Sequence, residues 1–320
     1  MLLYLLFIIG GAASTIYGAN WLIDGSSSIA RRLGISDLVI GLTIVSLGTS
    51  APELVVSVIS SINGVDDLAI GNILGSNIAN ILLILGATAI IFPLQIRLST
   101  KWKEIPFSFL AVIVLFILAN DVFMTPVNEG VNILSRADGV ILLLFLSVFF
   151  VYIFEMSRNK TTDNEVSKNM PVWRAVLLTV VGIIGLFLGG KYLVEGAVGA
   201  AKIFGISERI IGLTIVAIGT SIPELVTSII AALKRNADIA VGNILGSNIM
   251  NIFLILGITS VIQPLEFSLP SNIDIFVLAI ATMLLFVVTL VFGANTIKRK
   301  EGILFVMLYI CYLVYLIVGL

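Results

Sequence analysis

Histidine is absent from this 320-residue chain, and cysteine occurs only once, as Cys311. Without histidine the chain has no imidazole ligand for a transition metal and no imidazole proton relay, so a transition-metal enzyme is disfavoured. A single cysteine excludes an internal disulfide, and we expect Cys311 to be a buried thiol in the last helix. The net charge of −1 gives no indication of nucleic-acid binding.

Charged residues are also scarce. They make up 12% of the chain, whereas a soluble protein of this size carries about 25%. Hydrophobic residues reach 59%. The composition is therefore that of an integral membrane protein.

Ten apolar segments are each about 20 residues long, which is enough to cross a bilayer as a helix. They are 2–23, 38–62, 67–91, 104–120, 138–156, 172–195, 209–233, 238–262, 272–294 and 300–319. The first segment has no basic residue before it, so we expect a retained helix and not a cleaved signal peptide. The longest polar gap, 157–170, divides the ten segments into two groups of five and is too short to be a domain.

Most lysines and arginines fall in alternate gaps between these segments, among them the gaps that hold Arg31, Lys101, Lys234 and Arg299. Because cytoplasmic loops of membrane proteins are enriched in basic residues, these gaps are predicted to be cytoplasmic. An even number of spans then places both termini outside the cell. We expect a multi-pass protein of the cell (plasma) membrane.

The chain repeats itself without gaps at an offset of 171 residues. GNILGSNIANILLILG (71–86) and GNILGSNIMNIFLILG (242–257) agree at 14 of 16 positions. The full repeated motifs are 41–86 and 212–257. Each copy belongs to a five-helix unit, so the second unit must enter the membrane upside down relative to the first. Inverted repeats of this kind build alternating-access transporters with a central site.

The sequence therefore predicts an all-α integral membrane protein with ten transmembrane helices, arranged as two inverted-topology five-helix repeats. The first repeat is 1–156, a short cytoplasmic linker is 157–170, and the second repeat is 171–320. Acids such as Asp24 and Glu195, which follow or end apolar segments, are predicted to lie at helix ends in contact with water.

Two carboxylates lie inside predicted spans. Glu53 and Glu224 each follow a proline directly, in matching stretches of apolar sequence. An ionisable side chain at that depth costs at least about 2.5 kcal/mol, so it calls for a functional explanation. The proline removes a backbone hydrogen bond and crowds an earlier carbonyl. We expect freed carbonyls at 46–48 and 217–219 to point toward the polar face.

Polar residues recur around each carboxylate at three- and four-residue steps, so they share one helix face. They are Thr43, Ser46, Ser50, Ser57, Thr214, Ser221 and Ser228 in the second and seventh spans, and Asn72, Ser76, Asn80, Asn243, Ser247 and Asn251 in the third and eighth. Hydroxyl, amide, carbonyl and carboxylate oxygens are hard donors, the ligand set for Ca²⁺ and for Na⁺ alongside it. Two glutamates neutralise one Ca²⁺ or two Na⁺.

Each of these features also has a purely structural interpretation. A proline in a membrane helix often only kinks it, and serine and threonine often bond to carbonyls of their own helix. Asn72 and Asn243 can serve only to tie helices together, and Gly71 and Gly75 only to allow close packing. A structural role does not account for two carboxylates that recur with the same polar surroundings in both copies.

The sequences GTSAPELVVS and GNILGSNIAN, with GTSIPELVTS and GNILGSNIMN, closely resemble the two alpha repeats of the sodium/calcium exchanger family, within the calcium/cation antiporter superfamily. The resemblance covers nearly the whole chain and is that of a prokaryotic member. It implies a ten-helix fold with four cation sites in a diamond, and exchange of three Na⁺ for one Ca²⁺. It also implies a ligand set at the matching positions: Thr49, Ser50, Glu53, Ser76, Asn80, Thr220, Ser221, Glu224, Ser247 and Asn251, with the carbonyls of Ser46 and Ala217.

The chain departs from the family pattern in places. Asn251 stands where some prokaryotic and the potassium-dependent relatives carry aspartate, which leaves the site one charge less negative and argues against potassium co-transport. The proton-coupled branch resembles a GNxxE pattern, but no acid follows Gly71 and Asn72, or their repeat, at that spacing. The large cytosolic calcium-sensing loop of animal exchangers is missing, so we expect no regulation by that route.

We therefore expect a sodium/calcium antiporter that works by alternating access, a secondary active transporter and not an enzyme. It needs no cofactor; the transported Na⁺ and Ca²⁺ bind at its centre, and it is expected to function as a monomer in the lipid bilayer. Bound metal compensates the two glutamates and lets the site cross, whereas the empty site is costly to move, which suppresses uncoupled return. The alternatives are a calcium/proton exchanger, a potassium-dependent sodium/calcium exchanger and a passive cation channel.

Overall fold

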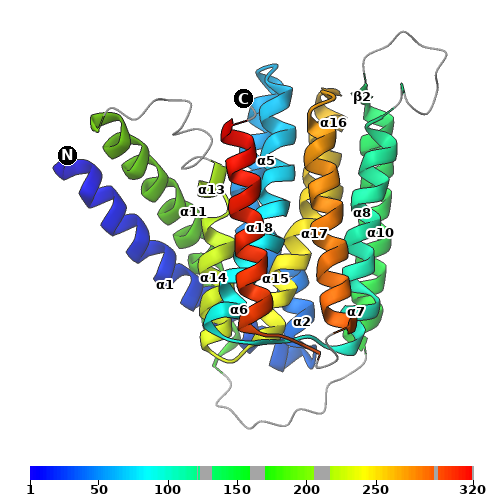
Figure 1. Cartoon of the computed structure of the whole chain (residues 1–320). Coiled ribbons are helices and arrows are strands. Elements are labelled where there is room, and N and C mark those ends of the chain that lie inside the picture. The colour runs from blue at the N-terminus through cyan, green and yellow to red at the C-terminus, as the bar shows by residue number, and fades with distance from the viewer. Residues whose placement is uncertain (121, 123–131, 159–169, 205–216, 292–294, 319–320) are drawn as a thin grey trace.

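The computed structural model describes the whole chain except residues 121, 123–131, 159–169, 205–216, 292–294 and 319–320. The described residues form a bundle of helices (Figure 1). In the first half the helices are α1 (Leu2–Leu33), α2 (Asp37–Ile40), α3 (Ser46–Thr49), α4 (Ala51–Ile62), α5 (Asp66–Ile78), α6 (Gly86–Ile91), α7 (Leu98–Trp102), α8 (Glu104–Leu118) and α10 (Arg136–Arg158). In the second half they are α11 (Val172–Ile203), α13 (Ala217–Gly219), α14 (Ile222–Leu233), α15 (Ala237–Met250), α16 (Gly257–Ile262), α17 (Ser271–Val291) and α18 (Arg299–Val318).

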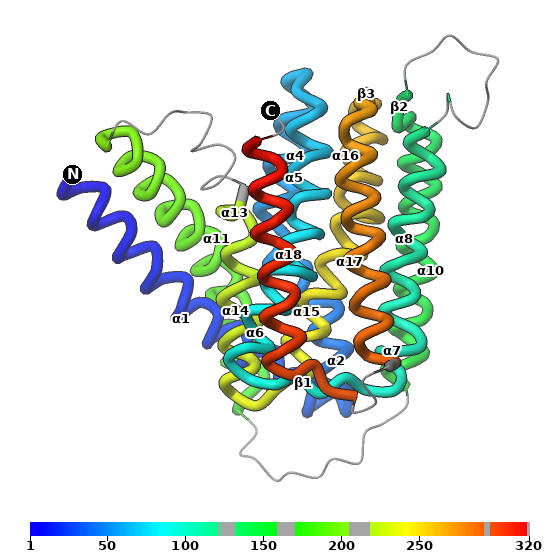
Figure 2. The backbone as a smooth tube through the Cα atoms, in the orientation of Figure 1, coloured from blue at the N-terminus to red at the C-terminus, as the bar shows by residue number. Residues whose placement is uncertain are grey.

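Two short antiparallel strand pairs each join the two halves of the chain. β1 (Leu94–Gln95) pairs with β4 (Thr296–Ile297), and β2 (Ile133–Leu134) pairs with β3 (Leu265–Glu266). The pairs lie at opposite ends of the bundle (Figure 2). Both β1 and β3 follow a proline that ends the preceding helix, because a residue before proline is driven out of the helical conformation.

The described helices agree with an all-α membrane protein. Seven of them are long and apolar enough to cross a membrane, and the bent pair Asp37–Thr49 and Ala51–Ile62 makes eight if it counts as one span. The helices α8 and α14 have 15 and 12 residues. Each of the ten predicted segments contains helix in its described part, and most boundaries lie within a few residues of the prediction.

Two helices extend further than predicted. The first continues past residue 23 to Leu33, and α11 continues past residue 195 to Ile203. Asp24 and Glu195 therefore lie inside helices and not at their ends, so that prediction was wrong. Small residues on the contact face keep the added turns packed against the partner helix, and Asp24 stays half-exposed while its Oδ1 pairs with Nζ of Lys234 at 2.7 Å.

The helices α1 and α11 pack against each other and lean away from the other helices (Figures 1 and 2). Glycines recur every seven residues along this contact: Gly11, Gly18 and Gly25 in α1, and Gly182, Gly189 and Gly196 in α11. A Cβ atom on Gly18 would lie 2.7 Å from the backbone nitrogen of Leu186 and 2.9 Å from the carbonyl oxygen of Gly182. The two backbones are therefore in direct contact, as small residues allow between membrane helices. We call this contact the glycine seam.

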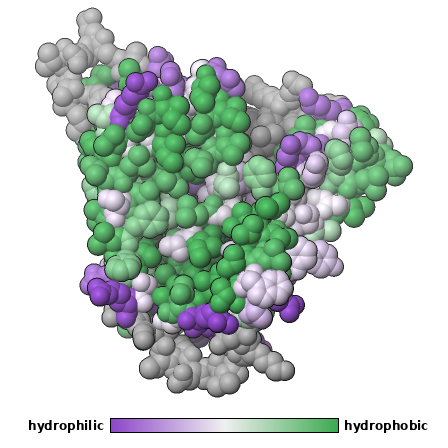
Figure 3. All heavy atoms as spheres, turned by 180° about the vertical axis from the view of Figure 1, so that it is seen from behind, coloured by the Kyte–Doolittle hydropathy of each residue, from purple (hydrophilic) through white to green (hydrophobic). Residues whose placement is uncertain are grey.

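The centre of the bundle is built from the third and eighth predicted spans. In the continuous helices 66–91 and 237–262, 78% and 83% of the most apolar window is buried, against 22% in α18. Seen from behind, hydrophobic side chains cover most of the middle of the surface, and hydrophilic ones gather mainly near its ends (Figure 3). A polar interior within an apolar outer surface suits a protein that crosses a bilayer several times.

Cys311 is exposed on α18, so the prediction of a buried thiol was wrong. The buried side of α18 is a stripe at three- and four-residue steps that includes Phe305, Tyr309 and Tyr312. Cys311 falls outside that stripe. An apolar helix at the bundle surface presents such residues to lipid, which the composition of the helix alone does not distinguish from burial.

The helix that carries the first carboxylate is broken. The axes of Asp37–Thr49 and Ala51–Ile62 differ by 46°. Ser50 carries the break, with φ −84° and ψ 7°, and Pro52 lies in the first turn of α4, where a missing N–H is tolerated. The described residues include three π-helical segments, η1 (Gly41–Val45), η2 (Ala79–Leu85) and η4 (Asn251–Leu256). Such π-turns are frequent at functional sites.

Candidate functional site

The two carboxylates predicted from the sequence lie in the interior of the bundle. Glu53 and Glu224 are each only 1% exposed. Each occupies the first turn of the helix that follows a break, α4 for Glu53 and α14 for Glu224. A negative charge there interacts favourably with the positive end of the helix dipole.

Each carboxylate accepts hydrogen bonds at one oxygen only. Oε1 of Glu53 accepts a bond from Ser76 Oγ at 3.4 Å. Oε1 of Glu224 accepts bonds from Ser247 Oγ at 3.4 Å and from Ser50 Oγ at 2.9 Å. Oε2 of either glutamate is buried and has no partner among the described residues. The bond from Ser50 to Glu224 joins the first half of the chain to the second.

The two candidate threonines also link the halves. Thr49 Oγ1 donates to Asn243 Oδ1 at 3.0 Å, and Thr220 Oγ1 donates to Asn72 Oδ1 at 3.2 Å. The side-chain nitrogen of each asparagine in turn donates to a serine hydroxyl of its own half at 3.1 Å. Asn72 and Asn243 therefore tie helices together, which is the structural role that the sequence left open, and they hold two candidate ligands in doing so.

Asn80 and Asn251 lie at the centre of the bundle, and each is at most 1% exposed. Their side-chain nitrogens donate at 2.9 Å to the amide oxygens of Asn248 and Asn77, respectively. The sequence analysis missed Asn77 and Asn248 because it followed the four-residue steps that pass through Ser76. The signal that could have found them is an asparagine in an apolar helix that recurs at the repeat offset.

Five side-chain oxygens of the candidate ligands are buried without a hydrogen-bond partner among the described residues: Glu53 Oε2, Glu224 Oε2, Asn80 Oδ1, Asn251 Oδ1 and Ser221 Oγ. A buried acceptor without a partner costs about 1–3 kcal/mol. Oxygens of this kind suit Na⁺ and Ca²⁺. No group of three or more histidine, cysteine, aspartate or glutamate side chains that could hold a metal occurs in the described part of the chain. A cation at this position would therefore be bound by two carboxylates together with neutral oxygens.

The backbone carbonyls at the breaks are less free than predicted. The Ser46 carbonyl accepts the N–H of Ser50 at 2.9 Å and also a threonine hydroxyl at 3.3 Å. At the second break the N–H of Ser221 donates to the carbonyl of Ile218 at 3.1 Å, one residue beyond Ala217. The proline removes its own hydrogen bond, but the residue two positions earlier keeps one. The candidate carbonyl of Ser46 thus already has two partners, while that of Ala217 lies at the start of α13.

Two hydroxyls of the predicted polar face do not reach the carboxylates. Thr43 Oγ1 donates to the carbonyl of Val39 in its own helix at 2.6 Å. Ser57 Oγ donates to the carbonyl of Ala69 at 3.4 Å. The predicted bond to a carbonyl of the same helix therefore holds for Thr43, whereas Ser57 ties α4 to α5. Thr214 lies outside the described residues.

The predicted close packing of glycines is confirmed in the second copy. A Cβ atom on Gly242 would lie 3.0 Å from Cα of Gly41, so α15 and the segment after α2 meet backbone to backbone. In the first copy, a Cβ atom on Gly71 or Gly75 would meet nothing within 4 Å. The partners expected there from the repeat offset, around residue 212, lie outside the described part of the chain.

A cavity of about 360 Å³ adjoins the candidate ligands. It lies between α4, α11 and α14, and its lining includes Pro52, Pro223, Phe187, Val194 and the candidate ligand Thr220. Most of these side chains are apolar. The site therefore borders open space on its α11 side.

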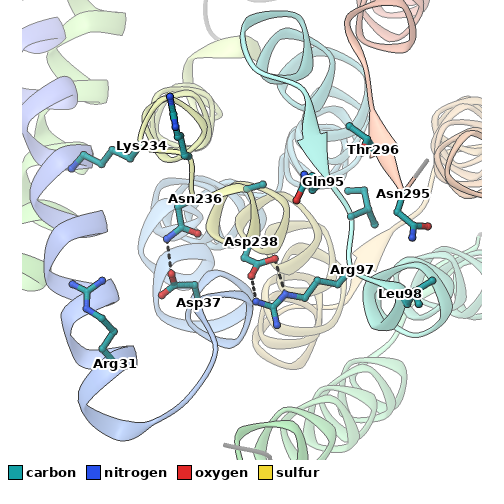
Figure 4. Close-up of a pocket in the computed structure, with 13 residues that line it drawn as sticks. Arg31, Asp37, Gln95, Arg97, Leu98, Lys234, Asn236, Asp238, Asn295 and Thr296 are labelled. Atoms are coloured by element: carbon teal, nitrogen blue, oxygen red, sulfur yellow. Dashed lines mark hydrogen bonds and ion pairs between the residues drawn. The ribbon is translucent and has the colours of Figure 1, made fainter. Parts of the chain in front are cut away.

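A larger pocket of about 780 Å³ lies at the end of the bundle that carries β1 and β4, and four basic and two acidic residues line it (Figure 4). Both acids are engaged: Asp238 binds Arg97, with Nε–Oδ1 at 2.9 Å, and Asp37 accepts a bond from Asn236 Nδ2 at 2.7 Å. A net positive lining does not suit a cation. The helices α2 and α15 start at this pocket, and further along they meet at the glycine contact described above.

Known proteins resemble this chain along nearly its whole length. A family model described as sodium/calcium exchanger protein matches residues 3–155 and 174–318. The putative antiporter CaxA of Alkalimonas amylolytica is 38% identical over 322 residues, which cover 98% of each chain. The sodium/calcium exchanger MaX1 of Methanosarcina acetivorans is 31% identical over 345 residues, which cover 97% of each chain.

The fold is similar to a solved one over nearly its whole length. A structure of the sodium-calcium exchanger NCX_Mj soaked with 2.5 mM Na⁺ and 1 mM Sr²⁺ superposes with a TM-score of 0.82 and 34% sequence identity, covering 98% of each chain. Sequence and fold thus match the same group of proteins from end to end.

Proposed function

This chain belongs to the sodium/calcium exchanger family, and from that premise we propose how it exchanges the two ions. It moves three Na⁺ in one direction and one Ca²⁺ in the other by alternating access, without a cofactor. The chain is a membrane transporter and not an enzyme.

The observation that carries the proposal is the pair of buried carboxylates, each with one oxygen that has no partner among the described residues. Glu53 and Glu224 are the main Ca²⁺ ligands, because carboxylates are the strongest oxygen donors for this ion. Two like charges in a medium of low dielectric constant repel each other. Bound Ca²⁺ compensates both charges. The loaded protein can then switch from opening on one side of the membrane to opening on the other.

Neutral oxygens complete the ligand set. Those that serve mainly Na⁺ are the hydroxyls of Ser50, Ser76, Ser221 and Ser247 and the carbonyls of Ser46 and Ala217, and the remaining ligands are Thr49, Thr220, Asn80 and Asn251. The buried hydroxyls and amides around the glutamates support this assignment. The existing bonds of the Ser46 carbonyl make it the weakest member of the set.

The proposed architecture is ten membrane spans in two inverted five-helix repeats, 1–156 and 171–320, joined by the linker 157–170. It is supported by hydrogen bonds that recur in pairs at the repeat offset, such as Ser76 to Glu53 and Ser247 to Glu224, both at 3.4 Å. Both termini lie outside the cell, the protein resides in the plasma membrane, and one chain is the working unit.

Ion-driven uptake into proteoliposomes tests the exchange. Vesicles loaded with Na⁺ are diluted into Na⁺-free buffer with ⁴⁵Ca²⁺, and uptake is expected only when the Na⁺ gradient is present. The substitution Glu53→Gln is expected to lower uptake by about 100-fold or more, because it leaves Glu224 without its matching charge at the ion. A matched control is Glu155→Gln, an exposed glutamate of α10 that lines neither of the two pockets described above, and it is expected to leave uptake unchanged.

The same vesicles separate the alternatives. Uptake driven by a pH gradient alone identifies a calcium/proton exchanger, and a requirement for K⁺ on the Na⁺ side identifies a potassium-dependent exchanger. Unitary currents in a voltage-clamped bilayer identify a channel. Full activity in the Glu53→Gln and Glu224→Gln double variant would refute the assignment of these two glutamates as ion ligands.

The proposed stoichiometry predicts a current. Two carboxylates with one Ca²⁺ carry no net charge, and with three Na⁺ they carry one positive charge, so one charge crosses per cycle. In Na⁺-loaded vesicles one positive charge then leaves per cycle. An inside-positive K⁺ diffusion potential set with valinomycin is therefore expected to raise the rate of Na⁺-driven ⁴⁵Ca²⁺ uptake, and an inside-negative potential is expected to lower it. A rate that does not respond to potential indicates two Na⁺ per Ca²⁺.

A further inference from the structure

Four asparagines meet where the third and eighth predicted spans contact each other, and their hydrogen bonds divide them into two kinds. Asn77, Asn80, Asn248 and Asn251 are all buried, each at most 1% exposed. Asn80 and Asn251 belong to the proposed ligand set, whereas Asn77 and Asn248 have no assigned role. Every bond among the four joins one half of the chain to the other.

The first pair is held through its nitrogen atoms. Asn80 Nδ2 donates to Asn248 Oδ1, and Asn251 Nδ2 donates to Asn77 Oδ1, both at 2.9 Å. A primary amide carries its oxygen and its nitrogen on one carbon, so a bond at the nitrogen fixes the direction of the oxygen. The Oδ1 atoms of Asn80 and Asn251 are buried and have no partner among the described residues. These are the two amide oxygens proposed to bind the ions.

The second pair is held at both ends of its amides. Asn77 Nδ2 donates to the backbone carbonyl of Asn248 at 3.2 Å, and Asn248 Nδ2 donates to the backbone carbonyl of Asn77 at 3.3 Å. Their amide oxygens accept the bonds from Asn251 and Asn80. Neither therefore offers a free oxygen to an ion, and neither amide can turn without breaking two bonds.

We propose that Asn77 and Asn248 are positioning residues, which hold the amide oxygens of Asn251 and Asn80 toward the transported ions and thereby set the affinity of the site. This inference rests on the proposed function. If the hold is lost, the ligand amides are free to turn their N–H groups toward the centre, and N–H donors repel a cation. Groups that orient metal ligands typically contribute a factor of about 10–100 to metal affinity.

The arrangement also accounts for an amide at position 251. An aspartate there could not donate to Asn77, and its carboxylate oxygen would face the amide oxygen of Asn77 across the present 2.9 Å contact. The pair Asn77 and Asn251 is therefore matched, in the same way as Asn248 and Asn80.

A double-mutant cycle tests the proposal by ion binding, without transport. The variants are Asn248→Ala, Asn80→Ala and the two together, each purified without ions and titrated with Ca²⁺ or Na⁺ while the unfolding temperature is followed. Asn248→Ala is expected to raise the half-saturating ion concentration by about 10–100-fold. In the Asn80→Ala background the same change is expected to add less than about twofold, because the group it positions is already gone.

Asn272→Ala is the matched control. Asn120 and Asn272 form a similar reciprocal pair between the two halves, with N–O distances of 2.9 and 2.8 Å, at the ends of α8 and α17. The Asn272→Ala substitution is expected to lower the unfolding temperature measured without ions. It is expected to leave the half-saturating concentrations of Ca²⁺ and Na⁺ unchanged. If Asn248→Ala fails to fold, Asn77→Ala with Asn251→Ala provides the same cycle on the other pair.

Two results overturn the proposal. One is an unchanged half-saturating ion concentration in Asn248→Ala. The other is a rise in that concentration that is equally large with and without Asn80. If neither ion stabilises the wild-type protein, the positioning role fails as well. A wild-type protein that binds both ions but does not exchange them refutes the proposed function alone, because the cycle measures binding and still decides whether these residues position the ligands.

Discussion

Ser50 and Ser221 occupy matching positions at the two helix breaks, but their hydroxyls differ. Ser50 Oγ donates to Glu224 at 2.9 Å, whereas Ser221 Oγ is buried and has no partner among the described residues. The hydrogen bonds around the two glutamates are therefore not equivalent in the two halves. An ion that enters the site finds one serine engaged and the other free.

This difference predicts unequal effects of two identical substitutions. Ser50→Ala is expected to lower the free energy of unfolding of the ion-free protein by about 1–3 kcal/mol, because Glu224 loses a buried donor. Ser221→Ala is expected to leave it unchanged or to raise it by up to about 1–3 kcal/mol, because the substitution removes a buried hydroxyl that has no partner among the described residues. Denaturant unfolding in detergent without Na⁺ or Ca²⁺ measures both. Equal effects of the two substitutions would contradict the asymmetry.

At the residue scale the sequence identified the acids but not the bonds around them. Glu53 and Glu224 stand out because a carboxylate in an apolar helix is costly. Asn77 was missed because it lies one residue after Ser76, off the four-residue steps of the predicted polar face. Thr43 donates to its own helix, whereas Thr49 donates across to the other half. Which of the two occurs depends on the helix that lies opposite, and a single sequence does not show which helix that is.

The glycine seam between α1 and α11 is the clearest feature at the scale of elements. Seven-residue spacing places successive glycines on nearly the same helix face, since seven residues make almost two turns. Both helices carry the spacing, so no side chain separates the backbones at these points. The length of α1 could not be predicted because its apolar sequence ends near residue 23, whereas packing along the seam continues to Gly25 and the helix ends at the left-handed Gly34, with φ 66°.

Two neighbouring glycines of α1 provide a direct test of the seam. A Cβ atom on Gly11 would lie 2.6 Å from the backbone nitrogen of Leu193, whereas one on Gly10 would meet nothing within 4 Å. Gly11→Ala is expected to destabilise the protein by about 1–3 kcal/mol, because backbone atoms cannot move aside. Gly10→Ala is expected to be neutral or to stabilise by up to about 1 kcal/mol. Unfolding temperatures in one detergent compare them, and identical values would argue that the helices are not in contact there.

The breaks were predictable as elements, and their details were not. The sequence Pro-Glu inside an apolar run predicts an interrupted helix, and the 46° bend agrees with it. Which carbonyl accepts a hydrogen bond depends on the conformation of the residue two positions before the proline. Ser50 bonds four residues back to Ser46, while Ser221 bonds three residues back to Ile218, so two matching sequences form two different turns.

The distribution of basic residues predicts the orientation of the whole molecule. Leu98 follows β1 in the chain and Leu269 follows β3, and these two strands lie at opposite ends of the bundle (Figure 2). The two leucines are 62% and 72% exposed. In a Cys311→Ser background, Leu269→Cys is expected to react with a membrane-impermeant maleimide in intact cells, whereas Leu98→Cys is expected to react only after permeabilisation. The opposite pattern would reverse the proposed topology.

At the scale of the molecule, the internal repeat made the general architecture predictable. The two halves contribute matching contacts, and the strand pairs and the asparagine bonds all cross between them. The resemblance to a known family added the identity of the ions, which oxygen chemistry alone left open between Na⁺, Ca²⁺ and a proton. The close approach of the two halves at Gly41 and Gly242 followed from neither, because it depends on how α2 and α15 pack against each other.

The bonds between the halves affect how the protein is made. Asn77 and Asn248 are separated by 171 residues, and each satisfies the other. A ribosome adds about 5–20 residues per second, so the first partner is complete roughly 10–30 s before the second emerges. During that interval the newly inserted helices carry a strip of unsatisfied amides and a carboxylate that lipid cannot solvate. The early helices are therefore expected to reach their final packing only after the late ones have been inserted.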